Sequence, residues 1–218
     1  MTDTKPVLAI LGGTGKEGPG LALRWAYAGY TVIIGSRQAE KAQATAQELN
    51  AQLGIERVRG MENAQAARLA EIAVLTVVQS AQQEALLSVR DAIQGKILVD
   101  ATARVDFRDP KPPAPPSAAR QAQEIVGPGV RVVAAFQNVP AHILKKNLEG
   151  AIATDVLVCS DDPDAAHTVI ELAKDAGMKA YYAGGLDNAL VVEGLTALLI
   201  SINKHYGVKN SSIGISGI

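Results

Sequence analysis

The chain has 218 residues, 48% of them hydrophobic, so it is long enough to bury one sizeable core. Its 21 basic and 22 acidic residues leave a formal net charge of −1, which argues against nucleic-acid binding driven by overall charge. The single cysteine, Cys159, excludes an intrachain disulfide and is typical of a reducing compartment. No apolar stretch predicts a membrane span or a signal peptide, so we expect a cytoplasmic protein with no membrane partner.

Strand-like and helix-like segments alternate through most of the chain. Five short, mainly apolar runs predict strands: 6–11, 30–37, 72–78, 95–102 and 130–136. Runs of this kind, without strict alternation of polar and apolar residues, are typical of strands covered on both faces, as in a parallel sheet. We therefore expect an α/β fold with a doubly wound parallel sheet.

Two later segments depart from this pattern. Residues 108–117 hold five of the ten prolines, which is typical of an extended surface connection. Residues 154–177 predict a strand, a capped helix and a glycine stop, and 179–185 predict another strand. A long, largely apolar helix is expected within 186–207. Because this helix has little polar face, we expect it to be buried in the core or against a partner subunit.

The segment LAILGGTGKEGPG, residues 8–20, places five glycines directly after the first predicted strand. Gly13, Gly15 and Gly18 satisfy the pattern G-x-G-x-x-G between a predicted strand and a predicted helix. Such glycines permit a tight turn, a diphosphate against the main chain, and close packing of helix on strand. The predicted cofactor-binding residues of this loop are Gly13, Thr14, Gly15, Lys16, Glu17 and Gly18. The alternative is a glycine-rich turn without a ligand.

The second predicted strand ends in Gly35-Ser36-Arg37, with Lys41 four residues beyond the arginine. A site for NAD usually has Asp or Glu here, which binds the ribose hydroxyls. A hydroxyl, a guanidinium and an ammonium group instead suit a 2′-phosphate, and Thr14 could add another hydroxyl. We therefore expect NADP(H) rather than NAD(H). The alternative is that Arg37 and Lys41 only face solvent.

The loops after the later strands predict the rest of the site, because ligands of open parallel sheets lie beyond the carboxyl ends of the strands. The loops that contain Thr76, Ala101 and 135–144 should surround the nicotinamide. His142 is a weak catalytic candidate, and a surface histidine is the favoured alternative. The histidines and the cysteine show no metal-ligand spacing, so we expect no metal. Few acid–base groups are needed if the protein mainly aligns two cofactor rings for hydride exchange.

The chain resembles a known family nearly end to end. The resemblance rests on residues 11–42, 71–77, 117–144, 155–166 and 183–207 and on the terminal IGISGI. These segments are similar to those of the NADPH-dependent F420 reductases, also called F420H2:NADP+ oxidoreductases. The resemblance implies reversible hydride transfer between NADP(H) and the deazaflavin coenzyme F420. It also implies a homodimer of subunits with a Rossmann domain, at 1–140, and a small C-terminal α/β domain, at 141–218, which closes the acceptor pocket.

Position by position, the resemblance implies contacts to each ligand. Thr14, Ser36, Arg37 and Lys41 would hold the adenosine phosphate, and Thr76 and Val77 would lie beside the nicotinamide. The residues implied for the deazaflavin pocket are Asn138, Val139, Pro140, Ala141, Tyr206 and Gly207.

Two segments depart from the family, and both lie on the acceptor side. Residues 77–80 are Val-Val-Gln-Ser where the family usually has Ile-Pro and an aromatic residue, and 101–110 lack the usual proline-bearing stretch. Two alternatives therefore stay open. The protein could be an NADPH-dependent reductase of another acceptor, such as a flavin, an imine or a carbonyl compound, or a non-catalytic NADP(H)-binding module.

Overall fold

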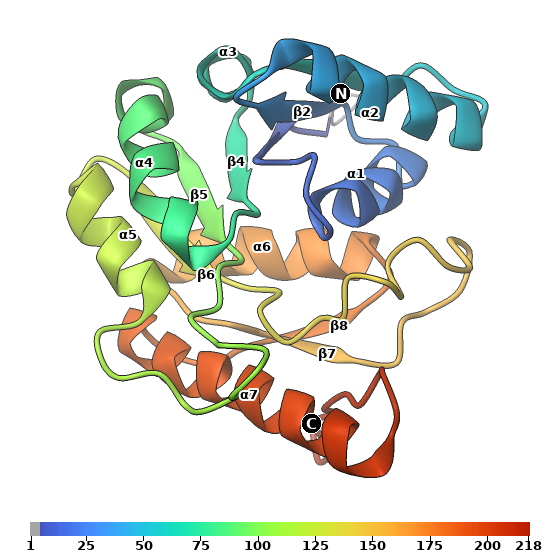
Figure 1. The fold of residues 1–218 in the computed structure, drawn as a ribbon. Helices are drawn as coiled ribbons and strands as arrows, with labels where there is room; N and C mark the ends of the chain where they lie inside the picture. Colours follow the sequence, from blue (N-terminus) through green and yellow to red (C-terminus); the bar gives the residue numbers. More distant parts are fainter. Residues whose placement is uncertain (1–4) are drawn as a thin grey trace.

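The computed structural model describes residues 5–218, which form a six-stranded and a two-stranded sheet with helices around them (Figure 1). The larger sheet is parallel, in the order β3-β2-β1-β4-β5-β6. Its strands are β1 (Leu8–Leu11), β2 (Val32–Ser36), β3 (Val58–Glu62), β4 (Ile72–Leu75), β5 (Ile97–Asp100) and β6 (Arg131–Ala134). The strand order reverses between β1 and β4, where ligands bind in doubly wound sheets. The predicted Rossmann-type fold is confirmed.

Helices cover both faces of this sheet. One face carries α1 (Gly18–Tyr27), α2 (Ala39–Leu53) and α6 (Pro163–Asp175). The other carries α3 (Asn63–Leu69), α4 (Gln79–Val89), the short helix η1 (Arg90–Ile93) and α5 (Ala118–Val126). Alternate residues of β1 belong to the two clusters, Leu8 and Ile10 to the first and Ala9 and Leu11 to the second. Coverage on both faces explains why the inner strands are mainly apolar.

The strand β3 is absent from the strands expected from the sequence. It lies at the edge of the sheet, and only its first residue, Val58, is buried. Its sequence, VRGME, therefore lacks the apolar run by which the inner strands are recognised. Three predicted strands also end at least two residues earlier than expected, β4 at Leu75, β5 at Asp100 and β6 at Ala134. The residues after each of them already belong to loops at the carboxyl edge.

The C-terminal part forms a second parallel pair, β7 (Asp155–Val158) and β8 (Lys179–Tyr182), connected by α6. Cys159 pairs with Ala134 in an antiparallel bridge, which joins this pair to the end of β6. Val156 and Val158 belong to the same core cluster as α1. The division into domains 1–140 and 141–218 stays a prediction.

The last helix, α7 (Ala189–Tyr206), follows the short helix η2 (Leu186–Asn188). It runs along the lower side of the molecule as drawn in Figure 1. Its buried side packs against α5, but Val191 is 65% exposed and Leu198 is 56% exposed. Within this chain, therefore, only one face of α7 is buried, and not the whole helix as expected. By length and composition alone, Leu186–Tyr206 would also suffice to cross a membrane, a test that core helices pass too.

Candidate functional site

The glycine loop, residues 12–18, connects β1 to α1 at the carboxyl edge of the sheet. The N–H of Gly13 donates to the carbonyl of Gly35 (2.9 Å), and the N–H of Gly12 donates to Oδ1 of Asn63 (3.1 Å). These bonds tie the loop to the end of β2 and to the residue after β3. Sequence reasoning missed Asn63, because it follows the one strand that was not predicted.

Several main-chain donors of the glycine loop are free. Across residues 5–218, the N–H groups of Thr14, Lys16 and Glu17 donate to no acceptor of the protein. Glu17 is the N-cap residue of α1, yet its side chain makes no cap hydrogen bond. Unpaired amides at a helix N-terminus form a site for a phosphate group, which the helix dipole also favours.

The three motif glycines differ in what surrounds them. A Cβ atom at Gly13 would lie 2.6 Å from the carbonyl oxygen of Ile10, and one at Gly18 would lie 2.6 Å from the Cα of Gly13. These two glycines are required by the packing of the loop itself. A Cβ atom at Gly15 would lie no closer than 3.5 Å to the protein, and Gly15 is exposed. The protein leaves the space above Gly15 open, as a site for a closely approaching diphosphate requires.

The end of β2 presents a hydroxyl and two basic side chains. Ser36 is buried, and its Oγ accepts a hydrogen bond from the N–H of Gln38 (3.2 Å), so the hydroxyl proton can be donated elsewhere. Lys41 is exposed in the first turn of α2. Arg37 lies 3.9 Å from Glu84, and both side chains are about three-quarters exposed, at 77% and 74%. Such an exposed pair contributes only about 0–1 kcal/mol, so Arg37 can exchange it for a phosphate.

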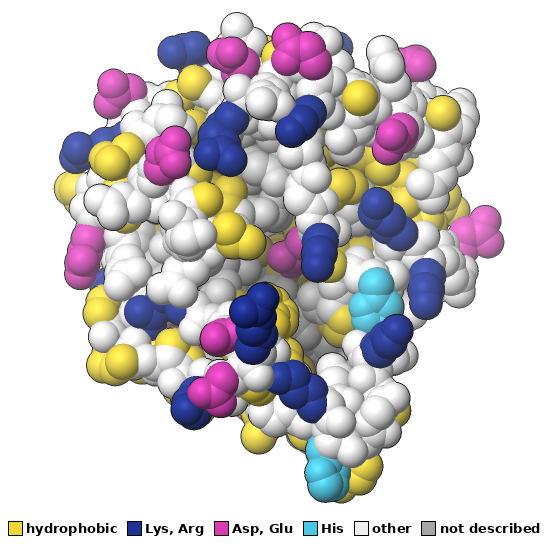
Figure 2. Space-filling model, in the orientation of Figure 1, with side chains coloured by type: hydrophobic (Ala, Val, Ile, Leu, Met, Phe, Trp, Pro, Cys, Tyr) yellow, Lys and Arg dark blue, Asp and Glu magenta, His cyan; other side chains and the backbone are white. Residues whose placement is uncertain are grey.

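Figure 2 shows that this face of the molecule is hollowed near its centre, with lysine and arginine side chains around the hollow. Exposed basic residues in the loops at the carboxyl edge include Lys16, Arg37, Lys145 and Lys146. Positive charge around a cleft attracts ligands that carry several negative groups.

Thr76, Val77 and Ala101 lie at the middle of the crevice, directly after β4 and β5. The main chain and the hydroxyl of Thr76 both donate to the carbonyl of Leu11 (3.0 and 3.3 Å). Val77 packs closely against Gly12, because a Cβ atom placed on Gly12 would clash with Cγ1 of Val77. These contacts fix the floor of the crevice beside the glycine loop.

Two carboxyl groups near this floor have raised pKa values, that of the fully buried Asp100 and that of the half-buried Glu17. Asp100 ends β5 with no exposed surface, and burial raises its pKa to about 6, although hydrogen bonds from Thr102 and Gln82 oppose the shift. Burial, together with the charge of Asp100, raises the pKa of Glu17 to about 8. Glu17 belongs to the predicted site, whereas Asp100 was missed. A charged residue that closes the apolar run ILVD was the available signal.

The predicted acceptor residues follow β6 and are held by buried contacts. Phe136 has φ of 74°, a strained conformation for a residue other than glycine, and its ring packs edge-on against Trp25 with centroids 5.8 Å apart. The Nδ2 of Asn138 donates to the carbonyl of Asp155 (2.8 Å), and its buried Oδ1 has no partner in the described part of the chain. Val139 is buried, whereas Pro140 and Ala141 are half-buried.

Residues 144–150 are held by a buried arginine that sequence reasoning did not single out. Arg24 of α1 is 3% exposed and makes five hydrogen bonds to main-chain carbonyls. The accepting residues are Leu144, Lys146, Asn147, Gly150 and Ala176. The helix that begins at the glycine loop therefore also anchors the segment after the acceptor residues.

Other predicted acceptor-side residues lie apart from this network. His142 is exposed in the loop after β6. Tyr206 is 71% exposed and Gly207 ends α7 with φ of 65°; among residues 5–218 neither has a hydrogen bond to residues 138–141. The tail beyond them returns to Asp155, whose carboxylate accepts from the N–H of Ile215 (2.6 Å).

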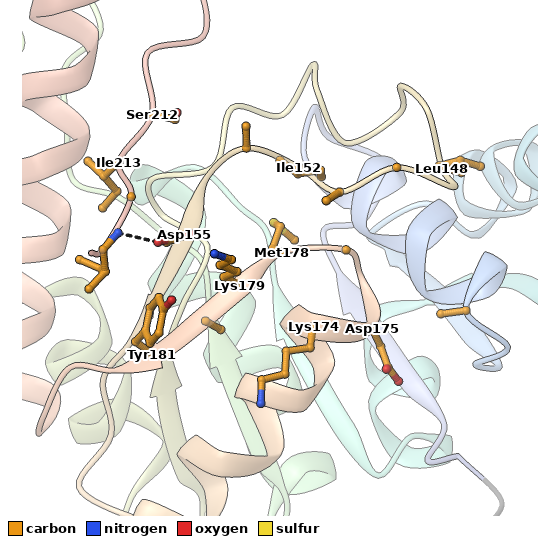
Figure 3. A pocket seen from close by; sticks show the side chains of 18 of the residues that line it. Leu148, Ile152, Asp155, Lys174, Asp175, Met178, Lys179, Tyr181, Ser212 and Ile213 are labelled. Carbon is orange, nitrogen blue, oxygen red and sulfur yellow. Dashed lines mark hydrogen bonds between the residues drawn. The ribbon is translucent and has the colours of Figure 1, made fainter. Parts of the chain in front are cut away.

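A second hollow, of about 1030 Å³, lies beside this tail and between the start of β7 and the end of α6 (Figure 3). Leu148, Ile152, Met178 and Ile213 give it an apolar lining. It contains none of the residues predicted for the cofactor or the acceptor, so the crevice at the carboxyl edge is the site supported by the sequence.

Comparison with known proteins gives one consistent family. The family described as "NADP oxidoreductase coenzyme F420-dependent" matches residues 7–104. The F420-dependent NADP reductase of Methanothermobacter marburgensis is 43% identical over 223 residues, which cover 97% of this chain and 98% of that protein. That of Methanocaldococcus jannaschii is 36% identical over 97% of this chain and 98% of its own.

A solved structure gives the same result. A protein of an Arthrobacter species, described as a candidate F420-dependent NADP reductase, superposes with a TM-score of 0.81 at 26% identity. The superposition covers 98% of this chain and 100% of the other. Fold, glycine loop and relatedness over the full length agree, and the chain belongs to the family of F420-dependent NADP reductases.

Proposed function

We propose that this protein transfers a hydride reversibly between NADP(H) and coenzyme F420. The observation that carries the proposal is the set of unpaired amides in the glycine loop, beside a strand end that offers Ser36 and Arg37 instead of a carboxylate. The nicotinamide supplies or accepts the hydride when it is bound. The chain's own contribution is to hold the two rings together and to keep water away from them.

For NADP(H), we assign the diphosphate to the main chain of residues 13–18, above the open space at Gly15, where the amides of Thr14, Lys16 and Glu17 are free to bind it. Ser36, Arg37 and Lys41 bind the 2′-phosphate, with Thr14 as a further hydroxyl donor. A guanidinium and an ammonium group are favourable there only when an anion is present, because the dipole of α2 disfavours cations in its first turn.

For the nicotinamide and the acceptor, we assign the floor and the far wall of the crevice. Thr76, Val77 and Ala101 border the nicotinamide. The deazaflavin stacks against residues 138–141, and Tyr206 and Gly207 close the pocket from the end of α7. His142, which is exposed in the same loop, stays the candidate for a catalytic side chain.

We further propose that residues 1–140 bind NADP(H) and that 141–218 close the acceptor pocket and form a homodimer in the cytoplasm. Support for the dimer comes from an apolar face of α7, which we define as the exposed residues Val191 and Leu198 and the half-buried residues Leu195 and Ile202. These residues follow one another at helical spacing, and an apolar stripe of this kind suits a second copy of the same helix. Leu198→Glu should halve the mass measured by light scattering, and an unchanged mass would refute this interface.

The direct test mixes purified protein with NADPH and oxidised F420 and follows the visible absorption of the deazaflavin. We expect this absorption to disappear, and to return when F420H2 is mixed with NADP+. Consumption of NADPH only with a free flavin or an imine would instead assign another acceptor. Tight NADPH binding without turnover of any acceptor would indicate a binding module.

A further inference from the structure

The segment after β5, residues 104–117, which we call the strap, has no main-chain support of its own. Among residues 5–218, no hydrogen bond between two main-chain groups involves residues 104–116. Five residues of the strap are prolines, which have no N–H to donate. A segment of this kind keeps one conformation only if side chains from other elements hold it, because ordering a free chain is costly.

Two side chains of α7 hold the strap. Glu193 is fully buried, and its Oε2 accepts hydrogen bonds from the main-chain N–H and from Nε of Arg104, both at 3.3 Å. Its Oε1 accepts from the N–H of Ala118 (2.6 Å), the first residue of α5. The Nζ of Lys204 donates to the carbonyl of Arg108 (2.8 Å). One carboxylate therefore binds the first residue of the strap and the residue directly after its last.

The ion pair of Arg104 and Glu193 is the best buried of those in residues 5–218, with side chains 9% and 0% exposed. The Nη2 of Arg104 also donates to the carbonyl of Ala114 (2.5 Å), so one guanidinium joins the two halves of the strap. A Cβ atom on Gly194 would lie 3.7 Å from Cβ of Pro112, which places the strap directly against α7 (Figure 1). Removing one partner of such a buried pair is costly, because the other charge is left unpaired.

The same face of α7 also holds the loop after β6. Oγ1 of Thr196 donates to the carbonyl of Gln137 (2.9 Å), the residue directly before the proposed deazaflavin wall at 138–141. Glu193, Thr196 and Lys204 share one face of the helix, since positions three and eight residues beyond the first fall close to whole turns. One helix face therefore fixes both loops on the proposed acceptor side.

The strap starts from the floor of the crevice. The N–H of Ala101 donates to the carbonyl of Leu75 (3.1 Å), and the N–H of Thr102 donates to Oδ1 of Asp100 (2.9 Å). The strap follows β5, residues 138–141 follow β6, and these two strands are neighbours in the sheet. Both segments therefore leave the same half of the carboxyl edge, across β4 from the glycine loop.

We propose that Glu193 is a positioning residue for the hydride acceptor: it fastens the strap to α7, and the strap forms one side of the acceptor pocket. The inference rests on the proposed function. Glu193 acts through the strap, so its loss should lower the affinity for the acceptor. The affinity for NADP(H) should not change, because separate hydrogen bonds to Gly35 and Asn63 fix the glycine loop.

The first test compares the affinities for the two ligands. Glu193→Gln keeps the shape of the side chain but replaces one acceptor oxygen by an NH2 donor, which then faces a donor of Arg104 or Ala118. By fluorescence titration, we expect the Kd for F420 to rise about tenfold and that for NADPH to stay within about twofold. The KM for F420 should rise while kcat changes less. Arg104→Met removes the same ion pair from the strap and should give the same pattern. Ser201→Ala is the matched control, because its hydroxyl bonds only to the carbonyl of Ala197 within α7.

The second test reports on the strap itself. Phe107, in the strap, is 69% exposed and is a site for chymotrypsin, whose product of residues 1–107 is identified by its mass. We expect Glu193→Gln to be cut there about fivefold faster than the unchanged protein, because an unfastened segment opens more often. In the unchanged protein, F420 should slow this cleavage and NADPH alone should not.

The protection measured in the unchanged protein can overturn the proposal by itself, whether or not a variant folds. Equal cleavage with and without F420 would show that the strap does not border the acceptor pocket. Equal losses of F420 and NADPH affinity in Glu193→Gln would indicate a general structural role and refute the positioning role. Failure of the unchanged protein to bind and reduce F420 would refute the proposed function and this inference with it. Reduction of F420 with the same KM in both proteins would refute this inference alone.

Discussion

The proposed NADP side and the proposed acceptor side of the crevice are built in different ways. On the NADP side, local backbone geometry provides the site: a tight glycine turn, free amides and a strand end. On the acceptor side, irregular loops are held in place by buried polar side chains that reach distant main-chain atoms, such as Arg24 and Asn138. A backbone-built site therefore depends on a short motif, whereas a loop-built site depends on contacts across more than 100 residues in sequence, such as that from Arg24 to Leu144.

The largest expected effect tests the backbone-built side. Gly15→Val should lower NADP(H) affinity at least about 1,000-fold, because the side chain fills the space for the diphosphate. The fold should persist, since a Cβ atom there comes no closer than 3.5 Å to the protein. Calorimetry gives the affinity and thermal unfolding the stability. Gly194→Ala, on α7 with its nearest neighbour at 3.7 Å, is the control. An unchanged affinity of Gly15→Val would remove the glycine loop from the site.

The matching test of the loop-built side is Arg24→Met. The substitution leaves five main-chain carbonyls without their donor, so the free energy of unfolding should fall by about 3 kcal/mol, as measured by urea denaturation. Affinity for F420 should fall as well, because residues 144–150 lose their anchor. Arg68→Met, at an exposed position of α3, should change neither quantity. If both variants behave alike, the acceptor loop does not depend on Arg24.

A third prediction concerns the floor that the two sides share. The pKa of Glu17 is raised from 4.5 to about 8, so the folded protein binds a proton that the unfolded chain releases. The free energy of unfolding therefore falls as pH rises between these values. Glu17→Gln should match the wild type near pH 4 and be more stable by about 2 kcal/mol at pH 6. Urea denaturation across this range measures the difference, and a constant difference at all pH values would contradict it.

The smallest effect concerns the cofactor preference. Arg37→Ala should weaken NADPH binding about tenfold and leave NADH binding nearly unchanged, because it removes a partner of the 2′-phosphate alone. Fluorescence titration with both nucleotides measures the ratio. Equal losses for the two cofactors would show that Arg37 does not distinguish them.

The candidate NADP site could be proposed from the sequence because its residues lie close together along the chain. The glycine motif, the apolar runs of β1 and β2, and the residues Ser36 and Arg37 fall within 30 consecutive positions. The edge strand β3 escaped prediction, since an edge strand needs no apolar run, and with it Asn63 was missed.

The sequence by itself determined the α/β alternation, the glycine loop and the chemistry at the end of β2, because helix and strand periodicity and turn residues act locally. Only the tertiary structure decided which polar residues are buried together. Asp100 and Glu17 are separated by 83 positions in the chain, and Arg24 and Gly150 by 126. Burial in a low dielectric, absence of a nearby cation and the reach of one side chain to distant carbonyls depend on packing in three dimensions, which no local pattern encodes.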